Sequence, residues 1–148
     1  MVSPQRIKGQ RVYLDTNIFI YQLVGYEPLR PQLDAVFGLI DREECRAVTS
    51  ELALAEILVK PLRDGNPDQE TQCRALLESN PHIELQPITR SILISAARIR
   101  AESALKLADA IHLATAQETK CAMVLTNDSR LRTTDGMEIV LLSDVRPV

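Results

Sequence analysis

The sequence predicts an α/β protein with a mainly parallel central sheet and helices on both of its faces. Short apolar segments typical of strands alternate along the chain with longer segments whose apolar residues recur at helical spacing. No tight-turn signal for a hairpin joins consecutive strand segments before the last pair. Strands that alternate with helices form parallel sheets, because each helix carries the chain back to the start of the next strand. The 148 residues contain no internal repeat, linker or low-complexity segment, so we expect a single domain over 1–148.

The first part of the chain is predicted to alternate strand and helix. A short buried strand over residues 11–14 leads through a turn at 15–17 into an apolar helix over 18–24. A strand at 46–48 is preceded by a helix over 29–42. That helix is predicted from apolar residues at helical spacing, namely Leu33, Val36, Phe37 and Ile40.

Two more helices have recognisable beginnings. Thr49 or Ser50 can cap the first, which we expect to end at Pro61, since a proline disfavours helical conformation in the residue before it. Asn66, followed by a proline, resembles a capping-box start for the second, predicted over 67–79.

The rest of the chain continues the alternation. Thr89 can cap the first of its two helices. The predicted elements are, in order, a strand, two helices and two strands, over residues 83–85, 90–102, 106–119, 121–125 and 139–142.

Composition narrows the class of protein. The net charge of -3, from 17 basic and 20 acidic residues, argues mildly against a nucleic-acid binder that is not an enzyme. Aromatic residues make up 3% of the chain without any Trp, so base stacking is not expected to dominate recognition. The three cysteines are widely spaced, which suggests neither a zinc site nor a disulfide framework. The polar N-terminus lacks the apolar core of a signal peptide and no run is long enough to span a membrane, so we expect a cytoplasmic protein without membrane contact.

Four acidic residues interrupt or directly follow strongly apolar segments far apart in the chain. They are Asp15, Glu56, Asp109 and Asp128. Burying one ionised carboxylate near a core is costly unless a partner or a metal compensates it. No matching set of Lys or Arg lies within these apolar segments, which favours one cation shared by the four. Asp15 and Asp128 also follow predicted strands, at the end of a parallel sheet where ligands gather.

Each acid also has a local explanation of its own. These are a turn or capping role for Asp15 and Asp128, and an ion pair for Glu56 with Lys60 or for Asp109 with Lys106 or His112. Four separate explanations holding together are much less probable than any one of them.

Hard oxygen ligands without clustered Cys or His favour Mg²⁺ or Mn²⁺ over zinc. Two such ions can activate a water and stabilise the leaving oxygen in an in-line displacement. This chemistry needs no Ser or Cys nucleophile and no His base, and the chain has only His82 and His112. Phosphodiester hydrolysis is the reaction that this combination predicts.

Four short segments together resemble the PIN domain family. They are YLDTN at 13–17, AEIL at 55–58, LADAIHLATA at 107–116 and LTND at 125–128. Their order and spacing are similar to those of the family, and the style of the motifs is closest to the VapC-type toxin ribonucleases of prokaryotic toxin-antitoxin pairs. The resemblance covers nearly the whole chain, although about ten residues precede the first strand where many toxins begin almost at once.

The resemblance implies a role for each matching residue. The four acids correspond to the family's quartet that binds Mg²⁺ or Mn²⁺ for RNA cleavage. Asn17 corresponds to the residue that orients the first Asp, and Thr126 to a small polar residue whose hydroxyl holds the last carboxylate or the scissile phosphate. The family fold is a three-layer α/β/α sandwich. VapC-type proteins are commonly homodimers, held inactive by a cognate antitoxin protein that covers the site.

Several nearby charged residues have simpler interpretations. Glu51 competes with Glu56 for the second position, but an acid in the first turn of a helix is explained by the helix dipole. Asp135 is interpreted as a turn residue, and Lys106 and Arg130 as surface charges that can also reach an RNA phosphate.

Two other functions stay open on the sequence alone. One is a PIN nuclease that processes RNA without an antitoxin, and the other is a catalytically silent PIN module that binds RNA or serves as a scaffold. An aspartyl phosphatase is more distant, because Asn17 stands where its second Asp is expected.

Overall fold

The computed structural model describes residues 1–131 and 136–147. Its five strands form one sheet in the order β3-β2-β1-β4-β5, and every neighbouring pair is parallel. The strands are β1 (Arg11–Leu14), β2 (Arg46–Ser50), β3 (Ile83–Gln86), β4 (Met123–Thr126) and β5 (Glu138–Leu141). The predicted α/β class with a mainly parallel sheet is confirmed, and the last pair of strands, which the sequence left open, is parallel too.

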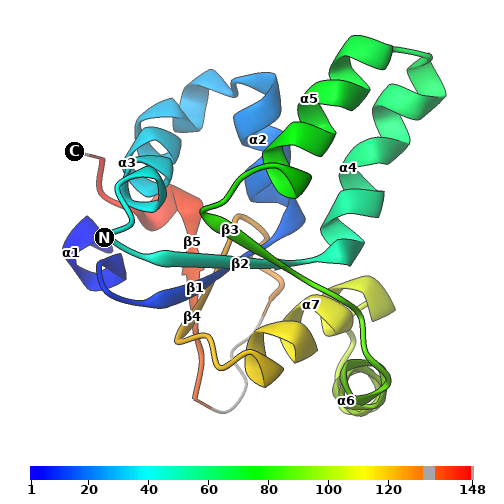
Figure 1. The fold of residues 1–148 in the computed structure, drawn as a ribbon. Coiled ribbons are helices and arrows are strands. Elements are labelled where there is room, and N and C mark those ends of the chain that lie inside the picture. The colour runs from blue at the N-terminus through cyan, green and yellow to red at the C-terminus, as the bar shows by residue number, and fades with distance from the viewer. Residues whose placement is uncertain (132–135, 148) are drawn as a thin grey trace.

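Helices cover both faces of this sheet (Figure 1). On one face lie α2 (Thr16–Val24), α3 (Arg30–Asp41), α4 (Glu51–Asp64) and α5 (Pro67–Glu78). On the other lie α6 (Arg90–Ala101) and α7 (Leu107–Glu118). A short helix, α1 (Pro4–Ile7), and two 3₁₀ turns, Glu27–Leu29 and Leu142–Asp144, complete the elements of the described chain. The predicted three-layer α/β/α arrangement is therefore present.

Alternation along the strands divides the core between the two faces. In β1, Val12 and Leu14 point into the large cluster formed with α2 and α3, whereas Tyr13 points into a smaller cluster beside α7. The same alternation separates Ala47 from Val48 in β2. Successive residues of a strand face opposite sides of a sheet, so both faces are apolar where helices cover them.

The order of the strands creates a switch point between β1 and β4. From the central β1 the chain builds outward through β2 to β3, then returns to place β4 on the other side of β1. Leu14 and Leu125 are paired in register there, and the amide of Asp15 donates to the carbonyl of Leu125 at 3.0 Å. Ligands of open α/β sheets bind beyond the carboxyl ends of the strands at such a point.

The predicted helix caps are present. The side chain of Ser50 accepts a hydrogen bond from the amide of Leu52 at 3.0 Å. Asn66 caps α5 by accepting from the amide of Gln69 at 3.1 Å, and Thr89 caps α6 in the same way. Each cap satisfies an amide that the helix itself leaves without an acceptor.

The prediction that the helix capped by Thr49 or Ser50, which is α4, ends at Pro61 is wrong. The helix continues to Asp64, and Gly65 closes it in the left-handed conformation. Pro61 has no amide hydrogen for the carbonyl of Ile57, one turn earlier. The buried thiol of Cys73, on the neighbouring α5, lies 3.7 Å from that carbonyl oxygen and donates to it. A partner supplied from another helix thus helps α4 to accommodate its proline.

The residues before β1 are tied to the C-terminal segment. Val2 forms a parallel bridge with Val145, with its amide donating to Asp144 and its carbonyl accepting from Arg146. The sequence did not predict α1 or this bridge. No helix in the described part of the chain is long and apolar enough to cross a membrane. Cys45, Cys73 and Cys121 are buried free thiols.

Candidate active site

Asp15 lies at the switch point, directly after β1, and is 6% exposed. It is the N-cap of α2, with Oδ1 accepting from the amide of Thr16 at 2.8 Å. Its other oxygen accepts from the hydroxyl of Thr126 at 2.7 Å and from the amide group of Asn17 at 3.3 Å. Three donors therefore hold this buried carboxylate, so a buried charge is tolerated here.

Thr126, the last residue of β4, connects the ends of the two central strands. Its hydroxyl donates to Asp15 and accepts from the backbone amide of Asp128 at 3.0 Å and the side chain of Asn17 at 3.2 Å. The hydroxyl thus contacts the first acid and not the carboxylate of the last one. Asn17 also accepts from the amide of Asn127 at 3.2 Å, so the same two side chains fix the loop that carries Asp128.

Glu56, on α4, is joined to the other layer of the protein through His112 on α7. Its Oε1 accepts from Thr16 Oγ1 at 2.6 Å and lies 2.7 Å from His112 Nε2. Burial opposes ionisation of Glu56, but the hydrogen bonds from His112 and Thr16 outweigh it and lower the pKa of this carboxyl. The alternative pairing with Lys60 is absent, because Lys60 bonds Asp64 at 2.8 Å.

Asp109, in the first turn of α7, is the acid with the fewest partners. Among residues 1–131 and 136–147, no group donates a hydrogen bond to its carboxylate, and neither Lys106 nor His112 forms an ion pair with it. Burial raises its pKa, and the negative charges of Asp15 and Asp128 raise it further. The Asp109 carboxylate therefore lies close enough to those of Asp15 and Asp128 to be repelled by both.

Asp128 is held by Arg130 in a forked ion pair. Nε of the guanidinium lies 2.9 Å from Oδ1 and Nη2 lies 2.7 Å from Oδ2, while the backbone amide of Arg130 also donates to Oδ1. The bond from Arg130 lowers the pKa of Asp128, and the charge of Lys106 acts in the same direction. The sequence predicted Arg130 as a surface charge. In the structure its guanidinium also bonds both carboxylate oxygens of Asp128.

The donor set fits a divalent cation in its chemistry. Mg²⁺ or Mn²⁺ would stabilise the Asp109 carboxylate, which the charges of Asp15 and Asp128 repel and which receives no hydrogen bond from the described residues. The side chains are nevertheless not gathered: within the described ranges, no three His, Cys, Asp or Glu residues form a group that could hold one ion. Glu56 contacts His112, and Asp128 is paired with Arg130.

Two further acids, Glu51 and Asp135, were given simpler interpretations from the sequence. Glu51 is exposed in the first turn of α4, as the helix-dipole interpretation requires. Asp135 lies outside the described residues.

Three residues of the site were not predicted as members of it, namely Tyr13, Thr16 and His112. The available signal was His112 itself, a polar side chain inside the buried run 110–116, which needs a buried partner.

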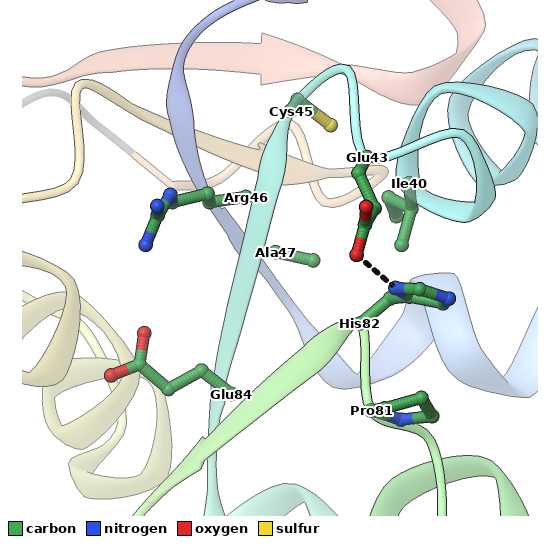
Figure 2. A pocket seen from close by; sticks show the side chains of 8 residues that line it. All are labelled: Ile40, Glu43, Cys45, Arg46, Ala47, Pro81, His82 and Glu84. Carbon is green, nitrogen blue, oxygen red and sulfur yellow. Dashed lines mark ion pairs between the residues drawn. The ribbon is translucent and has the colours of Figure 1, made fainter.

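A separate hollow of about 590 Å³ lies at the opposite end of the sheet, where β2 and β3 begin (Figure 2). Two of the side chains that line it, Glu43 and His82, point toward each other, with 3.5 Å between Oε1 and Nδ1. None of the predicted site residues lines this hollow. Its position at the amino ends of the strands separates it from the acids at the switch point.

Comparison with known families identifies the fold. The sequence profile described as the PIN domain matches residues 12–137, which include all four acids. The chain belongs to the PIN domain family. The extent of the match agrees with the resemblance seen in the four motifs. None of the curated protein sequences compared with this PIN domain matches it.

Solved structures of toxin-antitoxin proteins have the same fold as this PIN domain. A toxin-antitoxin complex from Klebsiella pneumoniae is 25% identical, with a TM-score of 0.65 over 85% of this chain and 94% of that one. VapBC-5 from Mycobacterium tuberculosis is 27% identical, with a TM-score of 0.59 over 89% and 98%. VapC20 of the same organism, a Sarcin-Ricin loop cleaving toxin, is 13% identical, with a TM-score of 0.65 over 80% and 91%.

Proposed function

We propose that this PIN domain is a Mg²⁺- or Mn²⁺-dependent endoribonuclease and the toxin of a type II toxin-antitoxin pair. The observation that carries the proposal is the carboxylate of Asp109, which has no hydrogen-bond donor among the described residues and whose pKa is raised by burial and by the charges of Asp15 and Asp128. An acid that is repelled by two neighbouring carboxylates at a sheet switch point is suited to binding a divalent cation.

The four acids, Asp15, Glu56, Asp109 and Asp128, are the proposed ligands. When bound, Mg²⁺ or Mn²⁺ would neutralise phosphate charge and lower the pKa of an attacking water. Asn17 and Thr126 hold the Asp15 carboxylate in place, so that its orientation does not depend on the ion. Lys106 and Arg130 lie beside Asp128 and supply positive charge for RNA phosphates.

The partners are proposed from the solved structures. One of the similar structures is a toxin-antitoxin complex, another is a member of the VapBC family of toxin-antitoxin systems, and VapC20 is a Sarcin-Ricin loop cleaving toxin. We propose RNA as the substrate and a cognate antitoxin as the inhibitor, with the nuclease acting as a cytoplasmic homodimer. Exposed apolar side chains available to a partner lie on α2, α4 and α6, and they include Ile20, Val24, Val59, Leu62, Leu93 and Ile94.

Cleavage of RNA by the purified protein tests this proposal. The wild type should cut RNA with Mn²⁺ or Mg²⁺ and leave 5′-phosphate and 3′-hydroxyl ends, as expected for a two-metal hydrolysis. Asp109→Asn should lose the activity while remaining folded, because only the ligand is removed. If Asp109→Asn cuts at the wild-type rate, the assignment is wrong.

Expression in a host separates a toxin from an RNA-processing nuclease. A toxin should arrest growth, and co-expression of a neighbouring small gene should relieve the arrest. A nuclease that cuts RNA in vitro but leaves growth unaffected on induction would instead be a processing enzyme.

One observation favours a second candidate, a catalytically silent PIN module. Glu56 contacts His112 and Asp128 is paired with Arg130. Among the described residues, no three His, Cys, Asp or Glu side chains form a group that could hold a metal ion. Calorimetry with Mn²⁺ separates the two functions. Binding that disappears in Asp109→Asn supports the nuclease, and absence of binding to the wild type supports the silent module.

A further inference from the structure

His112 occupies a buried position between two layers of the fold. The side chain is 2% exposed and reaches from α7 toward both β1 and α4. Nδ1 lies 2.5 Å from the hydroxyl of Tyr13, which is fully buried, and Nε2 lies 2.7 Å from Glu56 Oε1. Packing alone does not require this placement, since an apolar side chain would fill the same space without needing polar partners.

We infer that His112 is a positioning residue, which orients Glu56 for the site while Tyr13 fixes the orientation of the imidazole ring. The inference rests on the proposed function, because it concerns one of the proposed metal ligands. His112 itself is not assigned as a ligand or as a catalytic base.

The hydrogen-bond pattern is satisfied by one tautomer of a neutral imidazole. An ionised Glu56 offers only acceptors, so Nε2 must carry the hydrogen that it donates. Nδ1 is then an acceptor, and the hydroxyl of Tyr13 donates to it. A hydrogen bond to the second ring nitrogen is the usual way in which a protein fixes an imidazole's tautomer and angle.

Thr16 couples this arrangement to the first acid. Its hydroxyl donates to the same Glu56 oxygen that His112 contacts, and its amide donates to Asp15 Oδ1. His112 Nε2 lies 3.9 Å from that Asp15 oxygen. The histidine therefore sits where it sets the spacing between the first two acids. Residues that orient ligands in this way affect metal affinity by about 10- to 100-fold when replaced.

Two amide replacements separate positioning from packing. Gln at 112 places its terminal amide near the position of Nε2 and can still donate to Glu56, whereas Asn reaches only the position of Nδ1. We expect His112→Gln to keep most of the Mn²⁺ affinity measured by calorimetry, and His112→Asn to lose about 10-fold or more. His82→Asn, a histidine replacement at the distant hollow, should leave the affinity unchanged.

Tyr13→Phe tests the hydrogen bond between the Tyr13 hydroxyl and Nδ1 of His112. Removing only the hydroxyl should weaken Mn²⁺ binding less than His112→Asn does. The imidazole of His112 stays in place in this variant, but its angle is no longer fixed by a hydrogen bond to Nδ1. Thermal unfolding of every variant identifies any loss that comes from a damaged core. Equal losses for His112→Gln and His112→Asn at equal stability would overturn the inference.

Crystal structures of the metal-free variants give a readout that does not depend on activity. Glu56 should stay within hydrogen-bond distance of residue 112 in His112→Gln and turn away in His112→Asn. An unchanged Glu56 in His112→Asn would overturn the positioning role, even if the wild type cuts RNA. Conversely, a wild type that neither binds Mn²⁺ nor cuts RNA would refute the proposed function, and these structures would still decide what orients Glu56.

Discussion

The hydroxyl of Thr126 donates to the carboxylate of Asp15 across the ends of β4 and β1, with 2.7 Å between the two oxygens. Both side chains are buried, and the same hydroxyl accepts from the amide of Asp128. This one group therefore fixes the first acid and the loop that carries the last acid.

Replacing Thr126 with Val should destabilise the protein while preserving its shape. The change leaves a buried carboxylate with one donor fewer and a backbone amide without its acceptor, which costs about 1–3 kcal/mol in the free energy of unfolding. Urea denaturation measures the loss. Thr126→Ser, which keeps the hydroxyl, should recover most of it, and equal losses for Val and Ser would show that the hydroxyl is unimportant.

Asp109→Asn should make the metal-free protein more stable at neutral pH. The pKa of Asp109 is raised in the folded state, so the folded protein binds this proton more tightly than the unfolded chain does. Wild-type stability is therefore lost as pH rises from the unfolded pKa through the folded one, and the Asn variant does not suffer this loss. Unfolding measured at about pH 7 and about pH 3 should give a stability gain at the higher pH only.

Asp34→Asn is the matched control for that experiment, since Asp34 is exposed on α3. Its stability should stay within about 0.5 kcal/mol of the wild type at both pH values. A variant at Asp109 that is less stable than the wild type at neutral pH would contradict the repulsion among the acids.

Removing Arg130 should strengthen cation binding. In the metal-free protein both oxygens of Asp128 are bonded to the guanidinium, which a metal has to displace. An exposed pair of this kind contributes little, so Arg130→Met should bind Mn²⁺ only a few-fold more tightly by calorimetry. Lys106→Met removes a nearby charge without touching those oxygens and should have a smaller effect. An affinity that Arg130→Met leaves unchanged would count against the competition.

Divalent cations should stabilise the wild type against heat. A ligand that binds only the folded state adds about 2.7 kcal/mol at a concentration 100 times its dissociation constant. Mg²⁺ or Mn²⁺ should therefore raise the melting temperature, and EDTA should reverse the rise. Asp15→Asn should show no rise, and NaCl at matched ionic strength should give none with either protein. A rise of equal size in Asp15→Asn would mean that the ions bind elsewhere.

The sequence predicts the fold well because its signals are local. Apolar periodicity located the strands, and the caps at Asn66 and Thr89 are formed by side chains within three residues of their partners. Pro61 was interpreted wrongly because its compensation comes from Cys73, on another helix. A local rule has no access to a partner that only the folded chain supplies.

For the site, too, the sequence predicts what depends on local signals and topology, and it does not predict contacts that only the folded protein supplies. The ends of β1 and β4 are adjacent in the sheet, so the predicted positions of Asp15 and Asp128 follow from topology alone. The bond between Glu56 and His112 joins residues 56 positions apart on helices from opposite layers. Hydrophobic pattern and motif spacing say nothing about how these side chains turn, which is why the role of His112 emerges only from the structure.

The most direct test of the account is the anomalous difference map from crystals soaked in Mn²⁺. We expect a peak at the carboxyl ends of β1 and β4, with carboxylate oxygens of Asp15 and Asp109 at about 2.1 Å, similar to the distances of small divalent ions. Asp128 should turn from Arg130 toward that peak, and Glu56 should reach it while keeping its hydrogen bond to His112. A soaked crystal with Mn²⁺ elsewhere, or with no peak between these acids, would contradict the proposed metal site.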